Sequence, residues 1–145
     1  MSWTCGIVPR DHVPALWPVV ENHLERAIER AGGRISGQTV MKSILDGTHL
    51  LWIISDGDKI SAAMVTRIAE YPLKKMLVVE SLGGSELKHW LPVAFNALKG
   101  YAKDMSLSGI EMYGRSGWTR ALAPYGWRQS MVLCEVSIEQ EPTDV

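Results

Sequence analysis

The sequence of 145 residues is short of the features that mark several protein classes. It has two cysteines, Cys5 and Cys134, near opposite ends and without the spacing of a metal site. A disulfide framework is therefore not indicated, and we expect both thiols to be reduced in the cytoplasm. The longest apolar runs, such as residues 50–54, fall far below the roughly 20 residues of a membrane-spanning helix. The first residues also lack the charged and apolar regions of a signal peptide.

An excess of charge of one sign is absent as well. Fifteen basic and sixteen acidic residues give a formal net charge of −1, and the Lys and Arg residues form no basic stripe. We therefore expect no nucleic acid partner. The four histidines share no ligand spacing, so we expect no metal site. The composition, 46% apolar and 21% charged, is that of an ordinary globular domain.

The apolar patterns predict one α/β domain over residues 1–138 and a flexible polar tail over residues 139–145. The predicted order of elements is β-α-α-β-β-β-α-β-α-β, which indicates a mixed β-sheet with helices on both faces. The expected ranges are strand 2–8, helix 11–31, helix 36–45, strand 49–55, strand 59–68, strand 75–82, helix 85–105, strand 110–113, helix 118–123 and strand 128–138.

Residues 74–113 are the most informative stretch. An apolar strand leads to Gly83 and Gly84, and Ser85 follows as the expected N-cap of a long helix. A strand, a glycine turn and a helix N-terminus present free backbone N–H groups at the positive end of the helix dipole, a setting typical of phosphate binding. The alternative is that the glycines only allow a tight turn.

This order of elements, with its glycine turn after the fourth strand, resembles the GNAT fold of N-acetyltransferases over about residues 3–138. Residues 121–127, Ala-Leu-Ala-Pro-Tyr-Gly-Trp, are similar to the short helix, glycine and aromatic residue near the end of that family's domain. Three shorter motifs are similar to acetyltransferase-like proteins of tailed bacteriophages: Glu80-Ser-Leu-Gly-Gly, His89-Trp-Leu-Pro and Tyr113-Gly-Arg-Ser-Gly-Trp. A phage protein would act in the host cytoplasm or in the virion.

The resemblance implies acetyl-CoA as the cosubstrate and an amine, on a small molecule or a protein, as the acceptor. The pantetheine arm would pair with the fourth strand, and the pyrophosphate would border the glycine turn. The residues implied in coenzyme binding are Val79, Leu82, Gly83, Gly84, Ser85, Glu86 and Arg115. The turn departs from the family motif because it lacks the leading Gln or Arg and the usual spacing of glycines.

Glu80 is the first candidate for a general base because it lies at the end of the fourth strand, beside the implied cleft. The alternative is an ion pair with a nearby Lys or Arg. Tyr113 and Tyr125 are candidates to protonate the leaving thiolate, although for Tyr125 packing beneath the next turn is the favoured alternative. Ser116 could hydrogen-bond the leaving sulfur. Leu122 occupies the position where many family members carry a Tyr that acts as the general acid.

Two functions follow from these observations. The first is acetyl-CoA-dependent N-acetyl transfer to an unidentified amine. The second is a catalytically silent domain of the same fold that acts as a binding protein or a virion-associated phage protein. The departures from the motif favour the silent domain, and the strand, glycine pair and helix favour ligand binding. The acceptor is not encoded in a general pattern, and both a homodimer and a virion assembly are compatible with the sequence.

Overall fold

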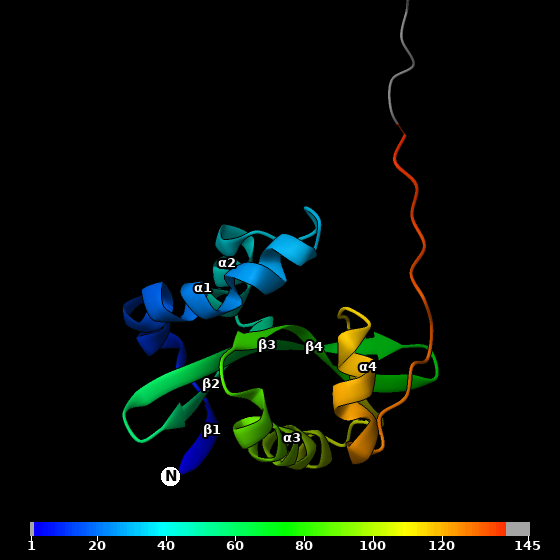
Figure 1. Ribbon diagram of the computed structural model, residues 1–145. Helices are drawn as coiled ribbons and strands as arrows, with labels where there is room; N and C mark the ends of the chain where they lie inside the picture. Colours follow the sequence, from blue (N-terminus) through cyan, green and yellow to red (C-terminus); the bar gives the residue numbers. More distant parts are fainter. Residues whose placement is uncertain (1, 139–145) are drawn as a thin grey trace, which may run out of the picture. The chain divides into compact units, whose positions relative to one another are not determined.

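A computed structural model describes residues 2–138 (Figure 1). The chain divides into two compact units between Tyr113 and Gly114, and each is described by itself. The single domain expected over residues 1–138 stays a prediction, and the predicted flexible tail lies outside the described residues. The elements of the first unit are β1 (Trp3–Ile7), the 3₁₀ helix η1 (Arg10–His12), α1 (Val13–Arg30), α2 (Gly37–Leu45), β2 (His49–Asp56), β3 (Lys59–Tyr71), β4 (Lys74–Gly84), α3 (Leu87–Asp104) and β5 (Gly109–Met112).

The first unit is built on a five-stranded mixed sheet in the order β1-β2-β3-β4-β5. Neighbouring strands are antiparallel except for β4 and β5, which are parallel and joined by the crossover helix α3. The turn at residues 56–58 joins β2 to β3 as expected. The predicted fold class, a mixed sheet within an α/β domain, is confirmed.

Helices cover both faces of this sheet (Figure 1). Leu51 of β2 belongs to an apolar cluster with residues of α1 and α2, such as Val20 and Ile44. The next residue, Trp52, contacts Tyr101 of α3 edge to face, with ring centroids 5.6 Å apart. Adjacent residues of a strand point to opposite faces, so α1 and α2 pack on one face and α3 packs on the other.

The start of α3 differs from the prediction that Ser85 is its N-cap. The cap is Glu86, which has a left-handed backbone with φ 61° and ψ 37°, and the helix begins at Leu87. The Ser85 N–H donates to the Ser61 carbonyl at 2.9 Å, and the Ser85 carbonyl accepts from the indole of Trp90. Because both backbone groups of Ser85 have partners inside the protein, the helix begins one residue later than predicted.

The second unit contains α4 (Gly117–Leu122) and the 3₁₀ helix η2 (Ala123–Tyr125). Gly126 follows with φ 86°, a left-handed conformation that suits glycine. The predicted strand at residues 128–138 is wrong, since this segment has no regular secondary structure. Met131 and Val136 are each 82% exposed. A strand requires a partner for its backbone, and apolar composition alone does not supply one.

Candidate active site

Strand β4 has two halves with different neighbours. Residues 76–79 pair with β3 on one side and with β5 on the other. Residues 81–84 continue the pairing with β3, but β5 has ended at Met112. The second half therefore has no sheet partner on its β5 side among the described residues. A strand edge of this kind presents backbone N–H and C=O groups to which another extended chain can bind.

The two glycines that were predicted to form a phosphate-binding turn lie inside this second half. Gly83 pairs with Ala63, and Gly84 pairs with Ala62. A Cβ atom on Gly83 would lie 2.2 Å from the backbone carbonyl oxygen of His23 in α1, and one on Gly84 would lie 2.4 Å from the Ser61 carbonyl oxygen. The glycines thus allow close contact between parts of the chain itself, which favours the structural alternative for their presence.

Glu80 is placed by an irregularity in the sheet at the junction of the two halves. Val79 pairs with Thr66 and Ser81 pairs with Val65, so Glu80 is an extra residue without a counterpart on β3. Such a bulge breaks the alternation of side chains and redirects the bulged residue, and bulges are common next to active sites. The Glu80 side chain is 22% exposed.

Two basic side chains hold one oxygen of this carboxylate. His49 Nε2 lies 2.7 Å from Glu80 Oε2, and Arg67 Nε donates to the same oxygen at 3.1 Å. His49 and Arg67 are cross-strand partners on β2 and β3, and the sheet positions them side by side. Among the described residues no hydrogen bond reaches the other oxygen, Oε1. One oxygen is therefore fixed, and the other keeps its hydrogen-bonding capacity unused within this part of the chain.

Both ring nitrogens of His49 have hydrogen-bond partners. The Thr48 hydroxyl oxygen lies 2.9 Å from His49 Nδ1 and 3.0 Å from the Ser43 carbonyl oxygen. On the other side of the ring, Nε2 faces Glu80 Oε2. These two contacts fix the orientation of the imidazole toward the Glu80 carboxylate.

The three side chains lie on the face of the sheet that α1 and α2 cover. His49 is two residues from Leu51, and Arg67 is two residues from Val65, and both apolar residues belong to the cluster with these helices. Glu80 was expected either as a base or in an ion pair with a nearby Lys or Arg, and it forms an ion pair with Arg67 at 3.1 Å. His49 was missed. The available signal was a histidine at the start of one apolar strand and an arginine inside the next.

The other predicted residues have different positions. Tyr113 directly follows β5 and is 58% exposed. It interacts with Tyr71, whose hydroxyl donates to Glu111. Hydrogen bonds to Glu111 and Tyr113 raise the pKa of Tyr71 above its usual range. Tyr71 and Tyr113 thus form part of a surface cluster with Glu111, at the parallel β4–β5 side of the sheet.

Arg115, Ser116 and Tyr125 belong to the second unit, and their predicted roles stay predictions. Ser116 precedes α4 without a side-chain capping bond, and Tyr125 is half-buried in η2. Leu122, which the resemblance aligns with a general-acid Tyr, is buried.

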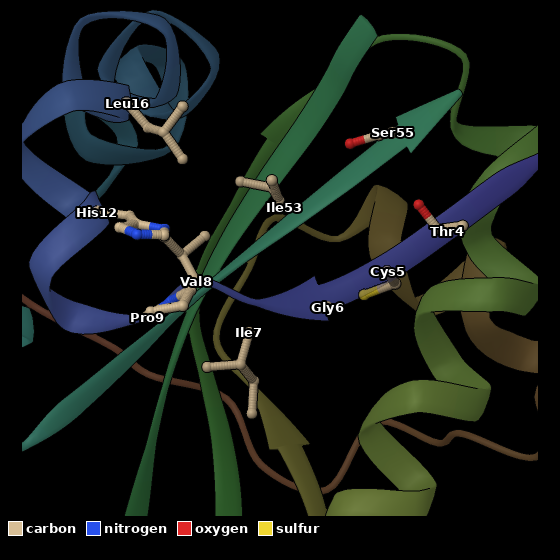
Figure 2. Close-up of a pocket in the computed structure, with 10 residues that line it drawn as sticks. All are labelled: Thr4, Cys5, Gly6, Ile7, Val8, Pro9, His12, Leu16, Ile53 and Ser55. Atoms are coloured by element: carbon tan, nitrogen blue, oxygen red, sulfur yellow. The ribbon is translucent and has the colours of Figure 1, made fainter. Parts of the chain in front are cut away.

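A cavity of about 310 Å³ lies away from Glu80, between the start of α1 and strands β1 and β2 (Figure 2). Its walls include Leu16, Ile53 and the hydroxyls of Thr4 and Ser55, and none of the predicted site residues lines it. Cys5 also borders it, and burial raises the pKa of this thiol to about 12. The thiol is protonated near neutral pH and is a weak nucleophile.

Within residues 2–138, no group of three or more His, Cys, Asp or Glu side chains could hold a metal ion. The helices of this part of the chain are too short or too polar to cross a membrane.

No protein-family model matches the chain, and no curated protein sequence matches it. Several solved structures are similar in fold. A predicted acetyltransferase from Clostridium acetobutylicum, crystallised with acetyl-CoA, has a TM-score of 0.67 at 11% identity, covering 94% of this chain and 96% of that one. A GCN5-related N-acetyltransferase from Ralstonia eutropha has a TM-score of 0.67 at 14% identity, covering 94% and 99%. An aminoglycoside acetyltransferase from an uncultured soil sample has a TM-score of 0.69 at 11% identity, covering 96% and 100%. The chain has the GNAT fold.

Proposed function

We propose that this protein, which has the GNAT fold, transfers the acetyl group of acetyl-CoA to an amine and that Glu80 is the general base. The observation that carries the proposal is the state of the Glu80 carboxylate. Oε2 is held by His49 and Arg67, and Oε1 has no hydrogen-bond partner among the described residues, at the point where β4 loses its β5 partner. A base of this kind is oriented and keeps one oxygen to accept a proton.

The residues along the second half of β4 fit the pantetheine arm of acetyl-CoA better than its phosphates. The unpaired edge at residues 80–84 suits the pantetheine arm, whose amide groups can hydrogen-bond to a strand. The glycines do not fit the predicted phosphate role, because the space beside them is filled by His23, Ser61 and Ala62. Val79 and Leu82 would border the arm, and the first-turn N–H groups of α3 would remain for the phosphates.

When bound, acetyl-CoA would supply an activated thioester. The chain would bind an acceptor ammonium group beside Glu80 and remove one proton to Oε1, which gives the neutral amine that can attack a carbonyl carbon. The new C–N bond forms as the C–S bond breaks, the amide nitrogen releases a second proton, and the thiolate takes up one. His49 and Arg67 would keep the carboxylate oriented during this transfer.

A silent binding protein is the second candidate, and specific observations favour it. The backbone of Ser85 is already hydrogen-bonded, and the anionic side chain of Glu86 stands at the helix start where a phosphate would bind. Leu122 cannot act as an acid. In this case acetyl-CoA or a partner would bind without reaction. The similarity to phage proteins, the cytoplasmic location and a virion role stay predictions.

The proposal is tested by release of free thiol from acetyl-CoA in the presence of a panel of amines. Positioned bases contribute about 10²- to 10⁴-fold, so Glu80→Gln should lower kcat by about that factor. Its glutamine keeps an oxygen that can accept from Arg67 and His49, and the fold should be retained.

Glu70→Gln is the matched control. Glu70 is an exposed residue of β3 that pairs with Lys75 at 3.7 Å, and this variant should keep the wild-type rate. Full activity in Glu80→Gln would remove Glu80 from the reaction. An absence of transfer to every amine, with acetyl-CoA still raising the melting temperature, would favour the silent binding protein.

A further inference from the structure

We infer that Arg67 forms an anion subsite beside Glu80 and that the acceptor is an amine which carries a carboxylate or phosphate group close to its nitrogen. This inference rests on the proposed function, since it names the class of acceptor at the same site. Its observations are the single hydrogen bond that Arg67 makes and the position of its unused guanidinium edge beside the Glu80 carboxylate.

The guanidinium group of Arg67 is only partly used. Its Nε–H donates to Glu80 Oε2, and no other acceptor in residues 2–138 engages its two terminal nitrogens. The side chain is 33% exposed. Arginine presents its donors in a planar fork that matches a carboxylate or phosphate with two parallel bonds. The Nη1–Nη2 edge is therefore a free fork next to the base.

The fork is also held in place before any ligand binds. Arg67 lies directly opposite His49 in the β2–β3 register, and its Nε is tied to Glu80. An exposed arginine normally loses rotamer freedom when it binds an anion, and an anchored one loses less. Arg67 is thus better prepared for an anion than a free surface arginine.

Charge complementarity favours the same class of acceptor. The site presents a carboxylate oxygen without a hydrogen-bond partner among the described residues, Glu80 Oε1, next to the unused guanidinium edge of Arg67. An acceptor that carries both an ammonium group and an anion can place the ammonium at Glu80 Oε1 and the anion on Arg67, and each charge then meets an opposite one.

The inference is tested by calorimetry on the protein without acetyl-CoA, with matched pairs of probes. α-Amino acids are paired with their amides, and phosphoethanolamine is paired with ethanolamine. In the wild type we expect the anionic member of at least one pair to bind ten times more tightly or better. The pair that shows this preference distinguishes a carboxylate from a phosphate.

The ratio of the two dissociation constants within that pair should fall to about one in Arg67→Gln. In Arg67→Lys, which keeps the charge but not the fork, the ratio should take an intermediate value. Arg30→Gln, at the exposed end of α1, should keep the wild-type preference. Equal binding within every pair in the wild type, or no binding of any probe, would overturn the inference, and so would a preference that persists in Arg67→Gln. The wild-type result decides even if a variant fails to fold.

The thiol-release assay separates this inference from the proposed function. Binding that depends on the anion without any acetyl transfer would leave the Arg67 subsite standing and contradict the enzyme. Transfer to neutral and anionic amines at equal rates would leave the enzyme standing and contradict the subsite.

Discussion

The two halves of strand β4 show how one strand can serve the fold and the site separately. Residues 76–79 are paired on both sides, and Leu77, Val78 and Val79 are at most 1% exposed. The second half begins with Glu80, a half-buried residue on a bulge, and residues 81–84 are paired on one side only. The comparison teaches that the first half stabilises the protein and that the second half leaves a carboxylate beside an edge where the sheet pairing stops.

Truncation in the first half should have the largest effect on stability. Leu77 is fully buried between Ile68 on β3 and Ile110 on β5. Leu77→Ala should lower the free energy of unfolding by about 2 to 5 kcal/mol because it leaves a cavity. Urea denaturation measures this loss. Acetyl transfer per folded molecule should not change, and a large fall in kcat would contradict the separation of the two halves.

Substitution of Gly83 should have the next largest effect on stability, because Gly83 lets the second half of β4 pack closely against α1. Gly83→Ala places a Cβ atom against the His23 carbonyl, so we expect a loss of about 1 to 3 kcal/mol from overpacking. Gly100→Ala is the control, since Gly100 lies in α3 with open space around its Cβ position. That variant should be more stable by about 0.5 to 1 kcal/mol.

Both glycine variants are compared by denaturant titration. A wild-type stability for Gly83→Ala would mean that the glycine is not needed for the packing of α1. The phosphate role would then regain support.

Substitution of Ser81 should have the smallest effect on stability, although this residue is only 3% exposed. Within residues 2–138 its hydroxyl has no hydrogen-bond partner. Removal of a buried polar group without a partner is close to neutral or stabilising. Ser81→Ala should thus change the free energy of unfolding by less than about 1 kcal/mol in the unfavourable direction, as read from its melting curve. A larger loss would reveal a hydrogen bond that Ser81 makes in solution.

The order of elements could be predicted because each depends on local periodicity. The apolar runs in β2 and β3 and the helical spacing in α1 and α3 are visible in the sequence, and Ser36 caps α2 through its hydroxyl as expected. The prediction of a strand at residues 128–138 was wrong because strand formation depends on a partner elsewhere in the chain or outside it. Apolar composition describes only the strand's own residues.

The site could be predicted only in part for a similar reason. Glu80 was visible as a charged residue at the end of an apolar strand. Its contacts with His49 and Arg67 depend on the register of three strands and on a bulge, and register is a property of the whole sheet. The role of Gly83 depends on how closely the α1 backbone approaches β4, which no local pattern records.

Amide hydrogen exchange with and without acetyl-CoA tests the comparison most directly. Amides at residues 76–79 are already paired and buried, so their exchange should be slow in both samples. We predict that amides within residues 80–84 that face the unpaired edge exchange faster in the free protein and become protected when acetyl-CoA is added. Exchange at residues 80–84 that does not respond to saturating acetyl-CoA would contradict the account, because the open edge would then not be the site at which the cosubstrate binds.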